Sequence, residues 1–261
     1  MIMDNSENDE KGMLSPEDIA GLFDSVSVDA VYEQTKHIMW TVVQFKELQM
    51  MYSCAIKEIQ TKFEVLNTEF KLKHKRNPIY SIKTRLKSTE SIVNKIYKYN
   101  VPFTLESIEQ NINDVAGIRV VCSYIDDIYK IADALLAQDD VTLVAKKDYI
   151  LNPKPNGYRS LHLIISTPVF FAGGKKEVKA EVQIRTIAMD FWASLDHQLK
   201  YKQDIPEQEE IGRELKACAD VISETDRKML RLRDRIEAAE DAPSEEDVLF
   251  ERLRKLDTPI S

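Results

Sequence analysis

Hydrophobic residues recur at helical spacing along the first third of the chain. From Val31 onward they follow one another at steps of seven, four and three residues, at Ile38, Val42, Phe45, Tyr52, Ile56, Ile59, Phe63, Leu66 and Phe70. This period predicts one long amphipathic helix or a pair of helices. Asn77-Pro78 ends the pattern, because the residue before a proline disfavours helical backbone.

Short runs of β-branched residues dominate the middle of the chain. They predict four strands, at Gly117–Tyr124, Val141–Ala145, Leu161–Thr167 and Val178–Arg185. One helix is expected at 126–137, and Ser88 is placed to cap another that ends near Tyr99, with Ile92, Ile96 and Tyr99 facing inward. We therefore predict an α/β (α+β) domain with one mixed sheet of about five strands flanked by helices.

One face of the predicted sheet collects polar side chains. In the last strand the apolar residues alternate with Lys179, Glu181, Gln183 and Arg185, and in the strand before it His162 alternates with leucines. Successive side chains of a strand point to opposite faces, so these residues share one side of the sheet. Such a face is either exposed to solvent or the floor of a binding site.

A heptad pattern marks the C-terminal part of the chain. Beyond Pro206, steps of four and three residues alternate through Ile211, Leu215, Cys218, Ile222, Thr225, Met229, Leu232 and Ile236. A seam of this length packs against another helix, of the same domain or of another subunit, and its charged flanks favour the second. We expect a disordered acidic tail (1–27), N-terminal helices (28–76), a core (77–204) and C-terminal oligomerisation helices (205–261).

The charge distribution narrows the kind of ligand. The 261 residues carry a net charge of -8, yet the segment from Lys71 to Thr89 contains seven Lys or Arg residues and no acidic one. A basic patch on an acidic protein favours a confined anionic ligand such as a nucleotide. A solvated charged face is the alternative.

Several classes of protein are excluded by missing patterns. Cys54, Cys122 and Cys218 lie far apart and form no C-x-x-C pair, which predicts reduced thiols and no structural zinc. No run approaches the roughly 18 apolar residues of a membrane span, and the acidic N-terminus lacks the apolar centre of a secretory signal, so we expect a cytoplasmic protein without a membrane partner. The sequences of a P-loop and of a Rossmann dinucleotide site are absent.

Two carboxylates are candidates for metal binding. Asp114 precedes the first predicted strand and Glu181 lies within the last. Mg²⁺ is typically held by one or two carboxylates together with substrate phosphates, so this pair among Lys and Arg residues fits phosphoryl transfer. An aspartate before a strand is also common as a turn or capping residue. Lys87, Ser91 and Lys95 form a stripe near a helix start, where phosphates can bind.

Three long motifs resemble the synthetase domain of the RelA/SpoT family. They read NDVAGIRVVCSYIDDIY, KDYILNPKPNGYRSLHLII and AEVQIRTIAMDFWASLDHQLKYK, and RLKSTESIVNKI precedes them. Since the sequence shows neither the hydrolase nor the regulatory domains of that family, it is most similar to the small alarmone synthetases. The resemblance implies a nucleotidyltransferase-like fold, and tetramers formed through terminal helices.

The resemblance also implies an activity and the residues that perform it. Such enzymes, GTP pyrophosphokinases of the stringent response, transfer the β,γ-pyrophosphate of ATP to the 3′-hydroxyl of GTP or GDP and release AMP. Mg²⁺ would be bound by Asp114 and Glu181, and Glu181 is alternatively the base for the 3′-hydroxyl. ATP would contact Arg85, Lys87, Ser91, Lys95 and Arg119, with the adenine between the two arginines. GTP or GDP would contact Lys154, Asn156, Tyr158, His162, Gln183 and His197, with Tyr158 stacked on the guanine.

Other interpretations stay open at this point. No histidine is followed by aspartate, so no hydrolase activity is expected. A catalytically weak relative could bind single-stranded RNA through Lys71–Lys87, and a pure oligomerisation protein could be built on residues 211–236. Another nucleotidyltransferase could use the same two carboxylates. Glu181 could be an ordinary exposed strand residue, Tyr158 a packing residue of an Asn-Gly hairpin, and His197 a core or capping residue.

Overall fold

The computed structural model of the protein describes residues 28–74, 76–200 and 208–240. The tail expected at residues 1–27 lies outside the described residues, as does the chain beyond residue 240. The chain divides into two compact units, Met1–Leu48 and Gln49–Ser261. The sheet and the candidate site belong to the second unit.

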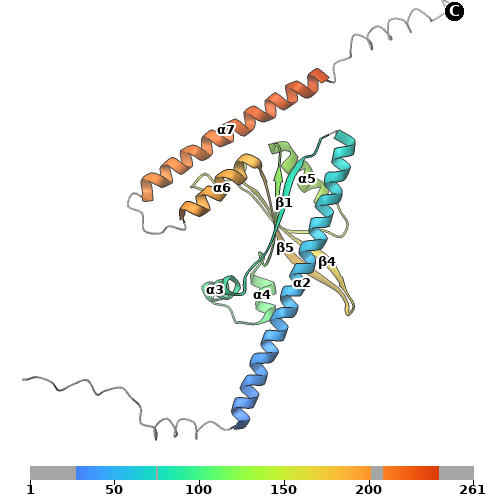
Figure 1. Ribbon diagram of the computed structural model, residues 1–261, viewed down its shortest axis with the longest axis vertical. Coiled ribbons are helices and arrows are strands. Elements are labelled where there is room, and N and C mark those ends of the chain that lie inside the picture. The colour runs from blue at the N-terminus through green and yellow to red at the C-terminus, as the bar shows by residue number, and fades with distance from the viewer. Residues whose placement is uncertain (1–27, 75, 201–207, 241–261) are drawn as a thin grey trace, which may run out of the picture. The chain divides into compact units, whose positions relative to one another are not determined.

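The predicted helices and strands appear in the predicted order, and the structure also contains strand β1 and helix α4, which the sequence did not predict (Figure 1). The helices described are α2 (Val28–His74), α3 (Thr89–Tyr99), α4 (Leu105–Asn111), α5 (Ile125–Leu136), α6 (Ile187–Lys200) and α7 (Gln208–Glu240). The strands are β1 (Ile79–Leu86), β2 (Ala116–Cys122), β3 (Thr142–Asp148), β4 (Leu161–Phe171) and β5 (Gly174–Thr186).

The five strands form one mixed sheet in the order β1-β2-β5-β4-β3. Strands β2 and β5 are parallel, and the other neighbouring pairs are antiparallel. The predicted mixed sheet of about five strands flanked by helices is confirmed. Strand β1 is the strand that the β-branched runs did not predict, because it is an edge strand in which Lys83, Thr84 and Arg85 are all exposed.

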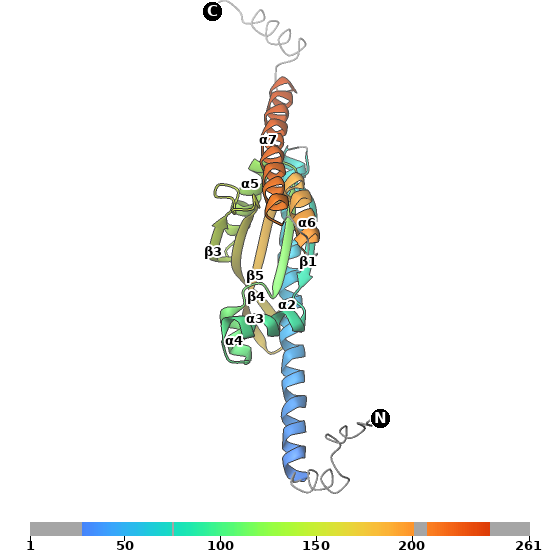
Figure 2. The ribbon, with the colours of Figure 1, turned by 90° about the vertical axis from the view of Figure 1, so that its left-hand side faces the viewer.

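One face of the sheet is apolar and covered by helices. Ile118 of β2 and Val182 of β5 are almost completely buried, and so are Tyr52, Ile59 and Phe63 of α2. The second half of α2 runs along this face, and it lies behind the sheet in Figure 2. Helix α5 packs against β2 and β5. This arrangement leaves the opposite, polar face for a site.

The N-terminal helical pattern folds as one helix rather than two. Helix α2 continues for 47 residues from Val28 to His74, which decides between the two possibilities left by its periodicity. Among the described residues, no helix carries an apolar stretch that could traverse a bilayer.

Helix α3 begins as predicted, with Ser88 as its N-cap accepting a hydrogen bond from the Ser91 N–H. Ile92 and Ile96 are buried, but Tyr99 is 45% exposed, so the expectation that it faces inward is wrong. The helix ends at Tyr99, where Asn100 adopts a left-handed conformation. The Tyr99 ring instead lies 5.7 Å from the Lys95 ammonium, a cation–π distance.

Helix α7 contacts its own domain partly through residues outside the heptad seam, although Ile222 of the seam lines a pocket together with Arg159 and Trp192. Ala219, Ser223 and Asp226 are buried against the domain. The seam residues of the second half of the helix are largely exposed, with Met229 at 50% and Ile236 at 59%. The seam is therefore available in this part of the helix for another chain.

Candidate active site

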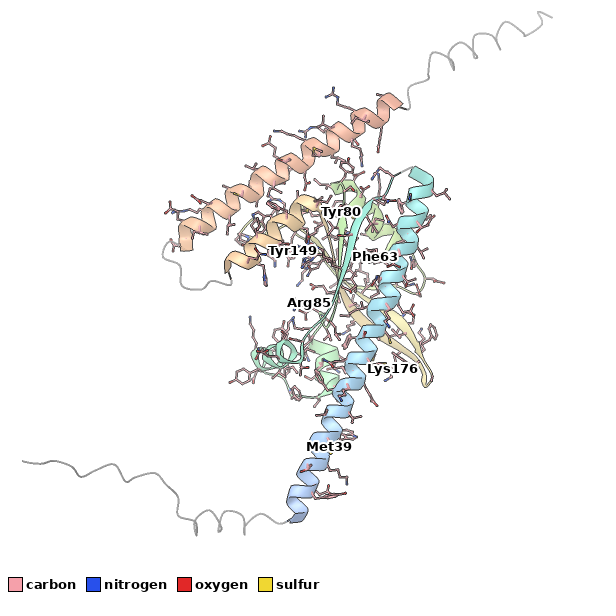
Figure 3. All side chains as sticks on the ribbon, in the orientation of Figure 1. Met39, Phe63, Tyr80, Arg85, Tyr149 and Lys176 are labelled. Atoms are coloured by element: carbon pink, nitrogen blue, oxygen red, sulfur yellow. The ribbon has the colours of Figure 1, made fainter. Side chains whose placement is uncertain are left out.

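A row of polar side chains crosses four strands on the face of the sheet opposite α2. Lys83 of β1 is paired with Arg119 of β2, Arg119 with Gln183 of β5, and Gln183 with His162 of β4. Paired residues of neighbouring strands point to the same side, so the strand register alone gathers these four side chains. Arg85, two residues along β1 from Lys83, lies on the same side of the sheet (Figure 3).

A closed ring of hydrogen bonds surrounds Glu181. His162 Nδ1 lies 3.1 Å from Glu181 Oε1, and Gln183 Nε2 donates to Glu181 Oε2 at 3.0 Å. The Tyr158 hydroxyl lies 2.8 Å from His162 Nε2. Arg185 Nη2 donates to Gln183 Oε1 at 2.6 Å and to the Tyr158 hydroxyl oxygen at 3.2 Å. Both oxygens of the Glu181 carboxylate are thus held from different sides. We call these five residues the Glu181 ring.

The direction of each hydrogen bond follows from which atoms of the five side chains carry a proton. An ionised carboxylate only accepts, so His162 Nδ1 donates to Glu181. Neutral imidazole then accepts at Nε2, where the Tyr158 hydroxyl donates. Arg185 donates to both of its partners in the ring. Each of the five hydrogen bonds of the ring thus joins a donor to an acceptor, while the buried Arg185 Nε has no hydrogen-bond partner.

The Glu181 ring also keeps the carboxylate ionised. Burial, the largest single influence, would raise the pKa of Glu181, but the hydrogen bonds donated by His162 and Gln183 bring it below its usual value. Burial raises the pKa of Tyr158 and lowers that of Arg185. Tyr158 therefore stays a hydroxyl donor at neutral pH, whereas Glu181 is a charged acceptor.

A second carboxylate, Asp114, is held by two ammonium groups. Lys87 Nζ donates to Asp114 Oδ2 at 3.0 Å, and Lys95 Nζ donates to Oδ1 at 2.8 Å. Burial raises the pKa of Asp114, but the hydrogen bonds and charges of Lys95 and Lys87 outweigh it, so the pKa lies below the ordinary value. The charge of Asp114 raises the pKa of Glu181, because the two carboxylates are close enough to repel.

The residues fit a magnesium ion better than a protein-only metal cage. In the described part of the chain, no group of three or more His, Cys, Asp or Glu side chains is arranged to hold a metal. Mg²⁺ needs fewer protein ligands, since it keeps waters and binds substrate phosphates. Asp114 and Glu181 supply oxygen donors of this kind, and their mutual repulsion is relieved by a cation.

Asp190 of α6 is a site residue that the sequence did not reveal. It lies 3.2 Å from Lys83, 3.4 Å from Arg119 and 3.5 Å from Arg185. These cations come from three strands, so no sequence motif brings them together. Asp190 sets the position of Arg119, which is one of the two arginines expected at the adenine.

The loop between β3 and β4, residues 149–160, carries aromatic and basic side chains to the same face. The Lys154 ammonium lies 4.7 Å from the centre of the Tyr149 ring and 4.9 Å from that of Tyr158. The rings of Tyr149 and His162 meet edge to face at 5.2 Å. Tyr149 is labelled in Figure 3 and was not predicted as a site residue. The loop turns tightly at Gly157, whose φ is 88°.

The remaining predicted residues are placed less centrally. Ser91 belongs to the first turn of α3, where its hydroxyl accepts from Ser88 at 2.8 Å. Asn156 donates to Asp196 of α6 at 3.3 Å. His197 is exposed on α6, and no hydrogen bond or ion pair described for this chain joins it to the Glu181 ring. The structure thus gathers the predicted residues of β1, β2, β4 and β5 but not His197.

Comparison with known proteins shows the family to which this chain belongs. The region found in RelA and SpoT proteins matches residues 84–206. GTP pyrophosphokinase YwaC of Bacillus subtilis is 45% identical over 195 residues, which cover 74% of this chain and 92% of YwaC. This chain belongs to the RelA/SpoT family. GTP pyrophosphokinase YjbM of the same organism is 33% identical over 199 residues, which cover 76% of this chain and 93% of YjbM.

Solved structures of the family share the fold. The small alarmone synthetase 2 of Bacillus subtilis superposes with a TM-score of 0.65 at 44% identity, covering 73% of this chain and 98% of that one. The small alarmone synthetase 1 of that organism, bound to its product pppGpp, has a TM-score of 0.67 at 34% identity and covers 74% and 98%. The predicted family and the RelA/SpoT synthetase fold are confirmed.

Proposed function

We propose that this chain is a GTP pyrophosphokinase, which transfers the β,γ-pyrophosphate of ATP to the 3′-hydroxyl of GTP or GDP. The observation that carries the proposal is the Glu181 ring, an ionised and doubly anchored carboxylate beside a second carboxylate and several cations. The related YwaC and YjbM are named for this activity. Synthesis of a guanosine alarmone and a role in the stringent response follow from it.

The ATP site is assigned to β1, β2 and α3. Because Arg85 is paired with Gly117, Arg85 and Arg119 are diagonal neighbours on one face of the sheet. Backbone positions related in this way lie about 7–8 Å apart. Long side chains reach across this backbone spacing, so the two planar guanidinium groups can lie on the two faces of one flat ring. Lys87 and Lys95 then turn from Asp114 toward the phosphates, with Ser91 beside them.

The guanosine site is assigned to the β3–β4 loop and the Glu181 ring. The Tyr158 ring offers a face for the guanine, while Lys154 and His162 lie beside it and reach phosphates. Asn156 and Gln183 complete the polar lining. His197 is the least supported residue of this set, because it lies exposed on α6. The related small alarmone synthetase 1 of Bacillus subtilis has been solved bound to its product pppGpp, which supports a guanosine site on this fold.

The Glu181 carboxylate is the group that removes the proton of the 3′-hydroxyl. His162 and Gln183 fix its two oxygens, and its lowered pKa keeps it free to accept a proton at neutral pH. The 3′-oxygen forms a bond to the β-phosphorus of ATP, the bond from that phosphorus to the αβ-bridging oxygen breaks, and AMP leaves. Mg²⁺, held by Asp114 and Glu181, would supply the Lewis acid that neutralises the phosphates.

A direct assay tests the proposal. The protein is incubated with Mg²⁺, ATP and either GTP or GDP, and the nucleotides are separated by anion exchange and weighed by mass spectrometry. We expect AMP to appear together with a guanosine nucleotide heavier by two phosphates, and Glu181→Gln to lower the rate at which both form by about 10²–10⁴-fold. Intact ATP with the unaltered protein would contradict the proposal.

Quaternary structure and location complete the proposal. A homotetramer formed through the terminal helices is supported by the exposed seam residues of α7 and, in the first unit, by exposed Met39, Trp40 and Val43. Light scattering of the purified chain tests it. We place the protein in the cytoplasm, where its nucleotide substrates are found.

The RNA-binding alternative has no specific support in the structure. Of the basic segment Lys71–Lys87, Arg76 is engaged by Asp127, Lys83 by Asp190 and Lys87 by Asp114. These cations serve the fold and the candidate site rather than an open track for a polynucleotide.

A further inference from the structure

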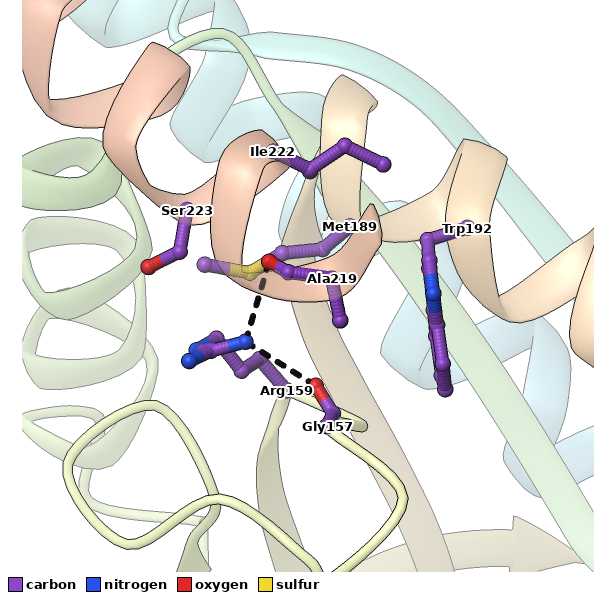
Figure 4. Close-up of a pocket in the computed structure, with 7 residues that line it drawn as sticks. All are labelled: Gly157, Arg159, Met189, Trp192, Ala219, Ile222 and Ser223. Carbon is purple, nitrogen blue, oxygen red and sulfur yellow. Dashed lines mark hydrogen bonds between the residues drawn. The ribbon is translucent and has the colours of Figure 1, made fainter. Parts of the chain in front are cut away.

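The arginine next to Tyr158 ties the β3–β4 loop to helix α7. Arg159 Nη1 donates to the carbonyl oxygen of Gly157 at 3.0 Å and to that of Ala219, in α7, at 3.1 Å. Its Nη2 donates to Asp220 Oδ1 at 3.0 Å. Figure 4 shows the two carbonyl contacts at a small pocket between the loop, α6 and α7. One guanidinium group thus joins two segments that are far apart in the sequence.

The direction of the Arg159 side chain explains this role. Residues 158 to 162 lead into β4, where successive side chains alternate between the two sides of the strand. Tyr158 and His162 take one side and contact each other in the Glu181 ring. Arg159 takes the other side and reaches α7. Its side chain is only 13% exposed, so it is held within the protein.

Gly157 brings the loop into direct contact with α7. Its φ of +88° is one that residues with a side chain rarely adopt, and a Cβ atom at this position would lie 2.5 Å from Ala219 Cβ. A small residue on each side is therefore needed for the two backbones to approach. The Gly157 N–H also donates to the Lys154 carbonyl oxygen at 2.8 Å, which closes the turn that carries Lys154.

Helix α7 is independently anchored to the end of the sheet. Thr186, the last residue of β5, donates its hydroxyl to Asp226 Oδ2 of α7 at 2.6 Å. Trp192 Nε1 of α6 donates to the Leu215 carbonyl oxygen of α7 at 2.9 Å. Because α7 is fixed to the strand that holds Glu181, it gives the β3–β4 loop a support with a defined position relative to the carboxylate.

We propose that Arg159 is a positioning residue of the guanosine site, which holds the Lys154–Tyr158 turn against α7 so that the Tyr158 ring is in place before the nucleotide binds. The inference rests on the proposed function, since it assigns a role to the loop that takes the acceptor. Arg159 itself does not contact the acceptor. Arg159 lowers the entropic cost of ordering the loop when the nucleotide binds. Its loss therefore weakens binding of the acceptor more than binding of ATP.

Three substitutions at Arg159 and its partner Asp220 should weaken GDP binding to different extents. Arg159→Ala removes all three hydrogen bonds, and we expect the dissociation constant for GDP to rise about tenfold, the change produced by 1.4 kcal/mol. Arg159→Lys keeps a charge near Asp220 but cannot bridge two carbonyl oxygens, so we expect an increase of about threefold, which is partial rescue. Asp220→Asn changes GDP binding less than twofold, because Asp220 is 53% exposed and its ion pair is screened.

A matched control separates positioning from general loosening of α7. Arg233 of α7 pairs with Asp126 of α5 at 2.9 Å, away from the β3–β4 loop. Arg233→Gln therefore weakens the attachment of α7 without touching the Arg159 contacts. We expect it to lower the melting temperature while leaving GDP affinity within twofold of the unaltered protein.

The experiment is calorimetric titration of the full chain with GDP, and separately with AMPCPP, at one fixed Mg²⁺ concentration. A loss of GDP affinity in Arg159→Ala, with AMPCPP affinity kept and partial recovery in Arg159→Lys, is the expected result. Unchanged GDP affinity in Arg159→Ala, or an equal loss in Arg233→Gln, overturns the positioning role. Whichever result the variants give, the proposed function survives if the unaltered chain binds GDP and makes product in the direct assay. If the unaltered chain binds neither GDP nor GTP, both fail.

Discussion

Glu181 and Asp114 are two neighbouring carboxylates on the same polar face, yet their surroundings differ. Glu181 accepts hydrogen bonds from His162 and Gln183, side chains placed by strand register. Asp114 lies in the segment before β2 and is neutralised by two ammonium groups, Lys87 and Lys95. The first environment fixes the orientation of a charge, and the second balances it.

This difference assigns different tasks to the two carboxylates. An oriented carboxylate with fixed lone pairs suits proton abstraction, because little reorganisation is needed during the reaction. A carboxylate balanced by lysines can release those lysines to phosphates when a cation takes their place. The comparison therefore predicts that substitutions around Glu181 lower the rate, whereas substitutions around Asp114 weaken ATP binding.

The largest effect is expected from Glu181→Gln. The amide keeps the shape of the side chain but can no longer take the proton, so kcat should fall by about 10²–10⁴-fold. Steady-state rates of AMP release measure it, with Glu177→Gln on the exposed end of β5 as the control. A variant that keeps more than half of its rate would remove Glu181 from the proton transfer.

Lys95→Met comes next and tests the other carboxylate. A charge-assisted hydrogen bond, such as the one proposed from Lys95 to an ATP phosphate, contributes about 1.5–3 kcal/mol. Without it, the KM for ATP should rise roughly 10- to 100-fold. The guanosine KM should change little. Lys98→Met, at an exposed position in the last turn of the same helix, is the matched control. Equal losses for both nucleotides would show that the two carboxylates do not serve separate substrates.

Arg185→Lys should have a moderate effect. Arg185 closes the Glu181 ring by donating to Gln183 and Tyr158 from one nitrogen, and lysine cannot keep both contacts and the pair with Asp190. We expect kcat to fall about tenfold, as for other side chains that orient a catalytic group, with the KM for ATP unchanged. A larger change in KM than in kcat would place Arg185 in substrate binding instead.

The smallest effect concerns stability in acid. The pKa values of Asp114 and Glu181 are lowered from 3.8 and 4.5, so both contribute stability that is present above those values and is lost as the pH falls through the lowered ones. Between pH 6 and pH 3, the melting temperature of Asp114→Asn should therefore fall by less than that of the unaltered chain. Parallel curves for the two proteins would show that Asp114 contributes nothing to the pH dependence.

The sequence predicted the parts of the fold that alternate cleanly. Strands β2, β4 and β5 and helices α3 and α5 follow from periodicity, because one side of each is buried and the other is polar. Edge strand β1 was missed, since its charged residues reflect the site rather than burial. Tyr99 was misplaced because a helix end exposes a position that the periodic pattern treats as internal.

The site was predictable as far as strand register could gather it. His162, Glu181, Gln183 and Arg119 meet because paired strands align them. Asp190 and Tyr149 were missed because they come from elements whose docking no local pattern encodes. The close approach of Gly157 to Ala219 is likewise a tertiary contact, so the sequence alone did not indicate it.

The most direct test of the central claim follows the β-phosphate of ATP. With ATP labelled at the β-phosphorus, Mg²⁺ and GDP, pyrophosphate transfer moves the label into the guanosine product and leaves AMP unlabelled. Label in ADP would indicate transfer of the γ-phosphate alone, and label in free pyrophosphate would indicate transfer of the nucleotide. We predict label in the guanosine product only, and either of the other two patterns would contradict the assignment of this face to pyrophosphate transfer.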